Sequence, residues 1–470
     1  MAALRRKEKH MLPVTAAQMR EATNGTLYGD ETLTVTALST DSRQITPGVW
    51  FVPIVGEKFD GHDFIDKALE AGAAGCFCAR LPDNLRSDKT YIQVSDTKRA
   101  MKELAQWYRG QFNLPVVQVT GSTGKTTIKE MIATVLSQRL NVLKTKGNFN
   151  GDIGTPLILL ELGPEHQAAV IETGMDAPGQ IRYLGEMVQP DFAVIGNIGE
   201  AHMEYLGSKE AILHAKCEIF ENLRSGGVAI LNGDDEMLNT VTLPFETLRC
   251  GLGENCNVRV ENVEDLGVEG VRCTVRTEKE IYPLAIPAPG VHMIYAASMA
   301  AAIGERLGLT KDEICRGVSA YQPAGERMRV EHLKGGRILL NDSYNANPQS
   351  MGAAIRILAK TDCGKRIAML GDMKELGAAT EPGHRAMGQL LGELGIDMLL
   401  AVGPFCREYM VPAAKAAGCP DVRWYADKKE AYDDLLAAYT PGAALLLKAS
   451  HFSGRFDLVA DFLRDYDFKD

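Results

Sequence analysis

Seven consecutive residues have the types and order of a phosphate-binding turn. They are Gly121, Ser122, Thr123, Gly124, Lys125, Thr126 and Thr127. An apolar run at residues 116–119 precedes them, and residues 128–136 follow with apolar side chains at helical spacing. In a strand, turn and helix of this kind, backbone N–H groups converge at the helix N-terminus, which suits an anion. We expect Lys125 to neutralise the β- and γ-phosphates of ATP, and the Thr126 hydroxyl to hold Mg²⁺.

The phosphate-binding turn departs from the strict G-x-x-x-x-G-K-[ST] pattern, because Val119 occupies the position of the first glycine. A short GxxGKT match also arises by chance as a simple glycine turn. The surrounding strand, turn and helix favour the phosphate-binding interpretation.

Polar residues that follow other apolar runs are candidate partners of this turn. Glu172 follows one run, His202 comes three residues after the turn 196–199 that follows another, and Lys216 lies on a helix beyond that. Asn232, with Asp234 and Asp235, ends a further run. Taken alone, a histidine at such a position is more often a core residue and a lysine is more often solvated. Asn and Asp residues after a strand more often form a surface turn. Ligands gather at the carboxyl ends of parallel strands, so their placement favours a shared site.

The elements that would position these residues form an α/β pattern. Apolar runs separated by helical segments indicate parallel sheets covered on both faces. We predict central strands at 116–119, 168–171, 192–195 and 228–231, and later strands at 337–340, 367–370, 398–402 and 443–447. We therefore expect three domains, at 12–110, 111–328 and 329–470: the second a P-loop ATPase-like parallel sheet, the third Rossmann-like.

Composition narrows the function classes. A net charge of −10 argues against nucleic acid as the main partner. Ten scattered cysteines indicate buried thiols in a reducing compartment rather than a disulfide framework. The uncharged stretch 284–304 is interrupted by Pro287, Pro289 and Gly290, which leaves too short a helix to cross a bilayer. We expect a soluble, cytoplasmic protein without an integral membrane segment.

Taken together, the motifs resemble the Mur ligases, the ATP-dependent amino-acid ligases of peptidoglycan precursor synthesis. The resemblance extends from about residue 41 to 448. The segments 342–348 and 370–377 resemble the branch that adds D-alanyl-D-alanine to UDP-N-acetylmuramoyl-tripeptide, and the Asp-Asn-Pro-Arg motif of a sister branch does not occur. The other matching segments are 41–43, 61–65, 120–127, 148–156 and 197–202. The resemblance implies an ATP-dependent amide ligase that acts through an acyl phosphate, and we expect a monomer.

The resemblance also implies a metal shell. Lys216 would be carbamylated by CO₂, which turns a cation into a carboxylate-like ligand. Thr126 and Glu172 would hold one Mg²⁺, and His202 with modified Lys216 a second.

Further roles follow by position in the family pattern. Arg327 would reach the nucleotide phosphates and Asp342 the ribose hydroxyls. Ser42 and Arg43 would contact the UDP-sugar. The remaining candidates are Asn148, Asn150 and Thr155 along the peptide channel, with Tyr344, Asn345, Asn347 and Lys448 near the dipeptide or nucleotide.

Two segments depart from the family pattern. Met293 and Ala296 replace the asparagines that usually contact adenine, and His451 replaces the arginine of a late Lys-Gly-Ser-Arg motif. Two alternatives remain open at this stage. One is a related ligase such as folylpolyglutamate synthase, whose phosphate loop lies nearer the N-terminus. The other is a non-enzymatic nucleotide switch, which would need no second α/β domain.

Overall fold

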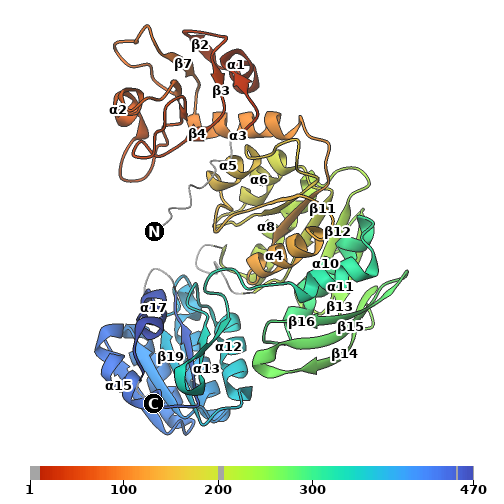
Figure 1. Ribbon diagram of the computed structural model, residues 1–470, viewed down its shortest axis with the longest axis vertical. Coiled ribbons are helices and arrows are strands. Elements are labelled where there is room, and N and C mark those ends of the chain that lie inside the picture. Colours follow the sequence, from red (N-terminus) through yellow and green to blue (C-terminus); the bar gives the residue numbers. More distant parts are fainter. Residues whose placement is uncertain (1–10, 200–205, 451–453, 469–470) are drawn as a thin grey trace.

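The computed structural model describes residues 11–199, 206–450 and 454–468, which form three lobes in chain order (Figure 1). The N-terminal lobe lies at one end, the central lobe follows, and the C-terminal lobe lies at the other end. Each lobe is built on its own sheet, and the sheets differ in size and strand direction.

The N-terminal lobe has a five-stranded sheet of order β2-β7-β6-β5-β4, in which β4 to β7 are parallel and β2 is antiparallel. Helix α3 packs against α1 of this lobe and against α5 and α6 of the central lobe, so it joins the two. The elements are β1 Val14–Thr15, α1 Ala16–Thr23, β2 Thr26–Tyr28, β3 Thr34–Val35, β4 Leu38–Ser39, β5 Trp50–Phe51, η1 Gly61–Phe64, α2 Ile65–Glu70, β6 Gly75–Cys78, β7 Thr90–Gln93 and α3 Thr97–Arg109.

The central lobe holds a nine-stranded sheet of order β16-β15-β14-β13-β12-β11-β8-β10-β9. Every residue of β8, β10, β11 and β12 is buried, as expected for strands covered on both faces. The elements up to β12 are β8 Val116–Thr120, α4 Lys125–Leu136, β9 Val142–Lys144, α5 Gly154–Leu159, β10 Ala168–Glu172, α6 Gln180–Val188, β11 Phe192–Ile195, α8 Lys209–Cys217, η2 Glu218–Asn222 and β12 Val228–Asn232.

Beyond β12 the central sheet continues further than the sequence analysis predicted. Strands β13 and β14 extend the parallel order, and β15 and β16 close it as antiparallel neighbours. Helices α4, α10 and α11 pack on one face of the lobe. The elements are α9 Glu236–Asn239, β13 Glu246–Gly251, β14 Val258–Asp265, η3 Gly267–Glu269, β15 Val271–Arg276, β16 Ile281–Ile286, α10 Met293–Arg306 and α11 Lys311–Ser319.

The C-terminal lobe has a six-stranded sheet of order β17-β18-β22-β19-β20-β21, parallel except for β17. Apolar clusters lie on both faces of this sheet, beneath α12, α13 and α14 on one side and α15 and α17 on the other. The elements are β17 Arg329–Leu333, η4 Lys334–Gly336, β18 Arg337–Asn341, α12 Pro348–Lys360, β19 Lys365–Gly371, η5 Gly377–Ala379, α13 Thr380–Glu393, β20 Met398–Val402, η6 Cys406–Met410, α14 Val411–Ala416, β21 Asp421–Tyr425, η7 Lys428–Ala431, α15 Tyr432–Ala438, β22 Ala443–Lys448 and α17 Asp457–Asp465.

The α/β class with parallel central and C-terminal sheets is confirmed, and each predicted strand of these sheets is present within a residue or two of its expected limits. The uncharged stretch 284–304 divides into the end of β16, a proline- and glycine-containing turn and α10. Across the described ranges, none of the helices has the length and apolar character needed to span a membrane.

Candidate active site

A cavity of about 640 Å³ opens between the central and C-terminal lobes. Its walls come from the carboxyl ends of β8, β10, β11 and β12, the start of α10, and the C-terminal lobe around β18, α12 and β22. Most residues predicted from the sequence as site residues line it: Ser122, Thr123, Gly124, Lys125, Thr126, Thr127, Asn148, Asn150, Glu172, Arg327, Asp342, Tyr344, Asn345, Asn347 and Lys448.

The phosphate-binding turn is held by its own backbone and by a neighbouring strand end. Gly121 and Gly124 have φ angles of 155° and 72°, and the second lies in the left-handed region that glycine adopts without strain. The Asn197 Oδ1 accepts hydrogen bonds from the backbone N–H groups of Ser122 and Thr123, at 3.1 and 2.9 Å. The turn is thereby fixed at the N-terminus of α4, where backbone N–H groups favour an anion.

A buried carboxylate lies beside this turn. Glu172 is only 2% exposed, and its two oxygens accept from different side chains. The Thr126 Oγ1 donates to Oε2 and the Asn150 Nδ2 donates to Oε1, each at 2.8 Å. The ammonium of Lys129 lies 3.9 Å from Oε2 and helps to balance the charge. The result is a group of oxygen atoms at the cavity wall, the kind of ligand that Mg²⁺ prefers.

Two lysine side chains converge on one carbonyl oxygen. The Lys125 Nζ donates to the Gly121 oxygen at 2.9 Å, and the Lys216 Nζ donates to the same oxygen at 3.1 Å. Burial lowers the pKa of Lys125, with Glu172 opposing that shift and Arg327 adding to it. Burial, and then the nearby Lys125, hold the pKa of Lys216 well below its usual range. Lys216 therefore tends toward the neutral amine, the form that reacts as a nucleophile.

The C-terminal lobe and the segment that leads into it present charged groups to the same cavity. The Arg327 guanidinium lies 3.8 Å from the centre of the Tyr344 ring. Asp342 accepts from the Met328 backbone N–H at 3.0 Å and forms an ion pair with Lys448. The Lys448 Nζ also donates to the Asn345 carbonyl at 2.9 Å, so this lobe offers a fixed cation and a fixed anion.

Some predicted site residues lie elsewhere. Lys216 is buried behind the phosphate-binding turn, and Thr155 is fully buried in α5. Ser42 lies in the N-terminal lobe beside Arg43, whose exposed guanidinium pairs with Asp41. His202, predicted as a metal ligand, falls outside the described residues, as does His451.

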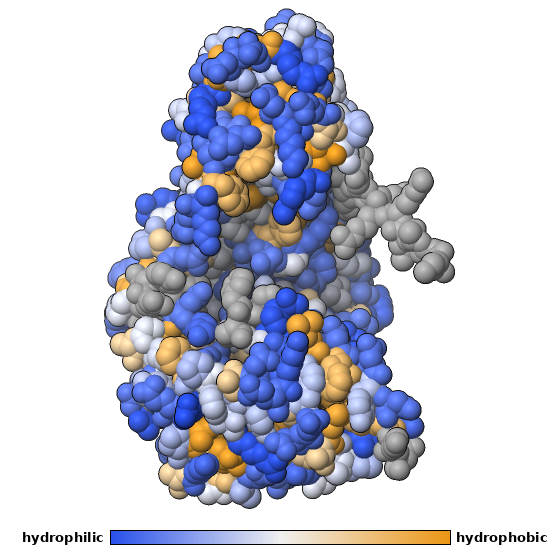
Figure 2. All heavy atoms as spheres, turned by 90° about the vertical axis from the view of Figure 1, so that its left-hand side faces the viewer, coloured by the Kyte–Doolittle hydropathy of each residue, from blue (hydrophilic) through white to orange (hydrophobic). Residues whose placement is uncertain are grey.

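A second, smaller cavity of about 240 Å³ lies where the N-terminal and central lobes meet. Thr36 and Leu38 line it from one lobe, and Phe149, Leu157 and Ile158 from the other. Figure 2 shows a face of the molecule that is hollowed beneath the N-terminal lobe, with apolar side chains among hydrophilic ones on that lobe.

Sequence reasoning did not assign two residues that shape the site. Asn197 braces the phosphate-binding turn, and it could have been noticed as the polar residue two positions after β11. Lys129 lies one helical turn after Lys125 and is 1% exposed. A lysine between Ile128 and Met131 on the apolar side of a helix signals a buried charge that needs a partner.

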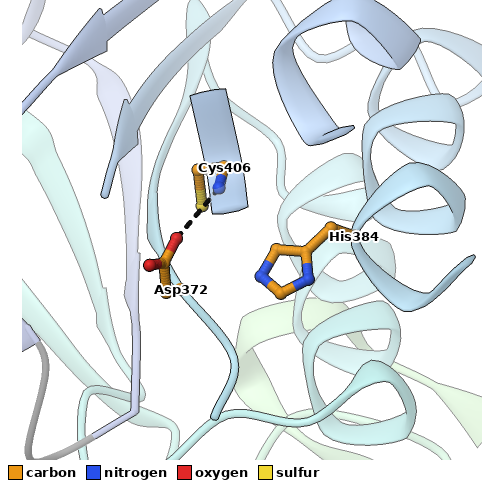
Figure 3. A group of neighbouring side chains, drawn as sticks. All are labelled: Asp372, His384 and Cys406. Atoms are coloured by element: carbon orange, nitrogen blue, oxygen red, sulfur yellow. Dashed lines mark hydrogen bonds between the residues drawn. The ribbon is translucent and has the colours of Figure 1, made fainter. Parts of the chain in front are cut away.

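A group of buried polar side chains lies in the C-terminal lobe, where Asp372, His384 and Cys406 approach one another (Figure 3). The Asp372 Oδ1 accepts from the Cys406 backbone N–H at 2.9 Å. The His384 Nε2 accepts from the Met373 backbone N–H at 3.1 Å, and Nδ1 donates to the Thr380 carbonyl at 2.7 Å. Both imidazole nitrogens are thus used by the backbone, so the cluster fixes loops rather than offering a metal site.

Comparison with known proteins agrees with this arrangement of a phosphate site between two α/β lobes. The chain belongs to the Mur ligase family. Residues 34–109 match the model described as Mur ligase family, catalytic domain, residues 119–304 the Mur ligase middle domain, and residues 326–451 the Mur ligase, glutamate ligase domain.

Two relatives above 30% identity share one printed name. The UDP-N-acetylmuramoyl-tripeptide–D-alanyl-D-alanine ligase of Escherichia coli is 37% identical over 454 residues, covering 96% of this chain and 98% of that protein. The enzyme of the same name from Bacillus subtilis is 34% identical, covering 96% and 99%. A crystal structure of MurF from Acinetobacter baumannii superposes with a TM-score of 0.87 at 31% identity, covering 96% of this chain and 99% of that one.

Two further solved structures share the fold at lower sequence identity. MurF ligase from Thermotoga maritima in complex with ADP has a TM-score of 0.80 at 27% identity, covering 91% of this chain and 97% of that one. A Mycobacterium tuberculosis folylpolyglutamate synthase complexed with ADP has a TM-score of 0.62 at 16% identity, covering 78% and 95%, and shares the fold alone.

Proposed function

We propose that this chain is an ATP-dependent ligase that joins D-alanyl-D-alanine to the terminal carboxylate of UDP-N-acetylmuramoyl-tripeptide in peptidoglycan precursor synthesis. The observation that carries the proposal is one shared cavity. In it, the phosphate-binding turn and Glu172 of the central lobe share a lining with Arg327, at the junction of the two lobes, and with Asp342 and Lys448 of the C-terminal lobe. The full-length similarity to enzymes named for this reaction supports the same assignment.

The donor atoms beside the phosphate-binding turn fit a Mg²⁺ ion. The Thr126 hydroxyl lies 2.8 Å from the Oε2 atom of Glu172, and hard oxygen ligands of this kind suit Mg²⁺. We assign these two residues to one Mg²⁺, and His202 with carbamylated Lys216 to a second. Carbamylation needs a neutral amine, and burial lowers the pKa of Lys216, which is the direction that favours this form. Bound Mg²⁺ would neutralise phosphate and carboxylate charge, which lets two anions approach.

The reaction proceeds in two steps. A tripeptide carboxylate oxygen attacks the γ-phosphorus of ATP, the bond to the β-γ bridging oxygen breaks, and ADP leaves with that electron pair. The free amine of D-alanyl-D-alanine then attacks the acyl carbon, and inorganic phosphate leaves as the amide forms. The amine proton is released to solvent. Catalysis is mainly positioning and charge neutralisation, as in other phosphoryl transfers.

Residues of this chain supply the positioning. Lys125 and the backbone N–H groups of the turn hold the β- and γ-phosphates, with Asn197 fixing the turn. Arg327 leaves Tyr344 to reach the phosphates, and Asp342 accepts from the ribose hydroxyls. Closure of the C-terminal lobe over ATP would exclude water from the acyl phosphate.

The remaining groups are assigned to the other two substrates. Ser42 and Arg43 contact the UDP-sugar, and Asn148, Asn150 and Thr155 belong to the peptide channel. Tyr344, Asn345, Asn347 and Lys448, which line the cavity, are assigned to the dipeptide or the nucleotide.

The proposal also covers the organisation of the protein. Residues 12–110 bind the UDP-sugar substrate, 111–328 bind ATP and 329–470 close over it. All ten cysteines are free thiols, seven of them buried, which fits a cytoplasmic enzyme. One chain supplies both walls of the main cavity, so one copy is enough to form the site, and we propose that the protein acts as a monomer.

Product analysis tests the proposal. Incubation of the full chain with ATP, Mg²⁺, the UDP-muramoyl tripeptide and D-alanyl-D-alanine should give the pentapeptide product, ADP and phosphate, detected by mass spectrometry. Omission of any one component should abolish the product. Formation of product with glutamate in place of D-alanyl-D-alanine, and none with the dipeptide, would identify a different ligase of the family.

A further inference from the structure

One end of the main cavity lies across the sheet from the phosphate-binding turn. The residues that line this end differ in chemical type from those of the turn. The turn follows β8, and β12 lies two strands away in the order β12-β11-β8, about 10 Å at the usual strand spacing. That separation suits the distance from the phosphates of a nucleotide to its base. Apolar residues form a slot there: Ala288, Pro289, Met293 and Ala296.

The polar groups in this slot are arranged around one carboxylate. Asp234 accepts from the backbone N–H groups of Leu252 and Gly253 at 2.7 and 2.8 Å. The Tyr295 hydroxyl donates to the Asp234 Oδ2 at 2.9 Å. A hydroxyl has one proton, and this one is directed to a carboxylate. The Tyr295 oxygen can therefore act toward a ligand only as an acceptor.

Asn232 supplies the complementary donor. Its Oδ1 accepts from the Asp234 backbone N–H at 3.0 Å, which orients the amide and leaves the Nδ2 group as a donor. Asn232 and Tyr295 both line the cavity and both contact Asp234, so they lie at the same place. His292 also lines this end, but a neutral imidazole can donate or accept and does not select between bases.

We propose that Tyr295 and Asn232 read the amino edge of adenine: the Tyr295 oxygen accepts from the exocyclic amine, and the Asn232 amide donates to the adjacent ring nitrogen. A keto oxygen at the same position would face the Tyr295 lone pairs and the Asp234 carboxylate, and it would be disfavoured. The inference rests on the proposed function, because it assumes that the cavity binds a nucleoside triphosphate. In this proposal Tyr295 and Asn232 select the base. Met293 and Ala296 have no polar side-chain group that could bind it.

The test compares ADP with IDP, which differs at the base only by a keto oxygen and a ring proton. Isothermal titration calorimetry on the full-length protein with Mg²⁺ should give at least ~10-fold tighter binding of ADP, the usual scale when a polar group loses its partner. Tyr295→Phe should weaken ADP binding by about 3- to 10-fold and leave IDP binding within about twofold of that of the unmodified protein. The preference for ADP over IDP should therefore become smaller.

Tyr282→Phe is the matched control. The Tyr282 hydroxyl also donates to a carboxylate, Glu305 Oε2 at 2.6 Å, but Tyr282 does not line the cavity. This variant should bind ADP and IDP as the unmodified protein does. Equal binding of ADP and IDP by the unmodified protein would overturn the inference, as would equal weakening of both by Tyr295→Phe. Absence of binding of either nucleotide to the unmodified protein would instead overturn the proposed function, and the inference with it.

Discussion

Two buried carboxylates occupy equivalent places in two different lobes. Glu172 ends β10 in the central sheet, and Asp372 follows directly after β19 in the C-terminal sheet. They are 2% and 4% exposed, and each follows a strand in the interior of a mainly parallel sheet. Strand-end position alone would mark both as candidate ligand sites.

Their partners separate them. Glu172 accepts from Thr126 and Asn150, two side chains that line the main cavity with it. Asp372 accepts from the backbone of Cys406, beside a histidine whose two nitrogens are taken by backbone groups. A strand end provides a place for a charge, but an adjacent cavity and adjustable side-chain partners are needed before the charge can bind a ligand. We therefore expect Glu172 to take part in the reaction and Asp372 to stabilise the fold.

The largest effect should come from Glu172→Gln. The amide keeps the shape but loses the negative charge that we assign to Mg²⁺, so kcat should fall by about 10³-fold. Phosphate release with all substrates measures the rate, and thermal unfolding serves as the control, which should change little. A variant with normal turnover would remove Glu172 from the metal site.

Lys216→Met should lower kcat by about 10²-fold or more, because it removes the group that we assign to carbamylation. The unmodified protein should lose activity in CO₂-depleted buffer and regain it on addition of bicarbonate, whereas the variant should not respond. Lowering the pH protonates an amine, so the bicarbonate requirement of the unmodified protein should increase as the pH falls. A bicarbonate response that persists in Lys216→Met would place the carbamate elsewhere.

Thr126→Ala should reduce kcat/KM by about 10- to 100-fold, the usual result of removing a group that holds a metal or its ligand. Thr126→Ser keeps the hydroxyl that donates to Glu172 and should retain activity within a fewfold of the unmodified protein. When the rate is titrated against Mg²⁺, the alanine variant alone should need a higher Mg²⁺ concentration to reach half of its maximal rate. Equal loss in both variants would point to the Thr126 methyl group, and so to packing.

The smallest effect on activity should come from Asp372→Asn. Loss of the charge beside the Cys406 backbone N–H and Lys374 should lower the free energy of unfolding by about 1–3 kcal/mol. At a temperature where the variant stays folded, kcat should change less than about threefold. Urea denaturation and phosphate release measure the two quantities. A large drop in kcat without loss of stability would give Asp372 a direct part in the reaction.

Residues of the central lobe differ in how far the sequence could predict them. Lys125 and Thr126 lie in a local motif, and Glu172 follows an apolar run, so pattern and strand-end position were sufficient to propose them. Strand-end position could mark Asn197 only as a polar residue after β11, and it could not mark Tyr295, because the roles of both depend on side-chain contacts with the phosphate-binding turn and with Asp234.

The extension of the central sheet was missed for a related reason. Strands β14 to β16 alternate buried and exposed residues, so they lack the continuous apolar runs that identified β8 or β11. The buried position of Thr155 likewise follows from how α5 packs, which its sequence motif does not specify.

Transfer of an oxygen isotope tests the central claim most directly. The tripeptide substrate would carry ¹⁸O in its terminal carboxylate, and the phosphate released during ligation would be analysed by mass spectrometry. Formation of an acyl phosphate predicts one ¹⁸O atom in each released phosphate, because the carboxylate oxygen that attacks phosphorus leaves with it. Phosphate released without ¹⁸O, alongside normal pentapeptide product, would contradict the account.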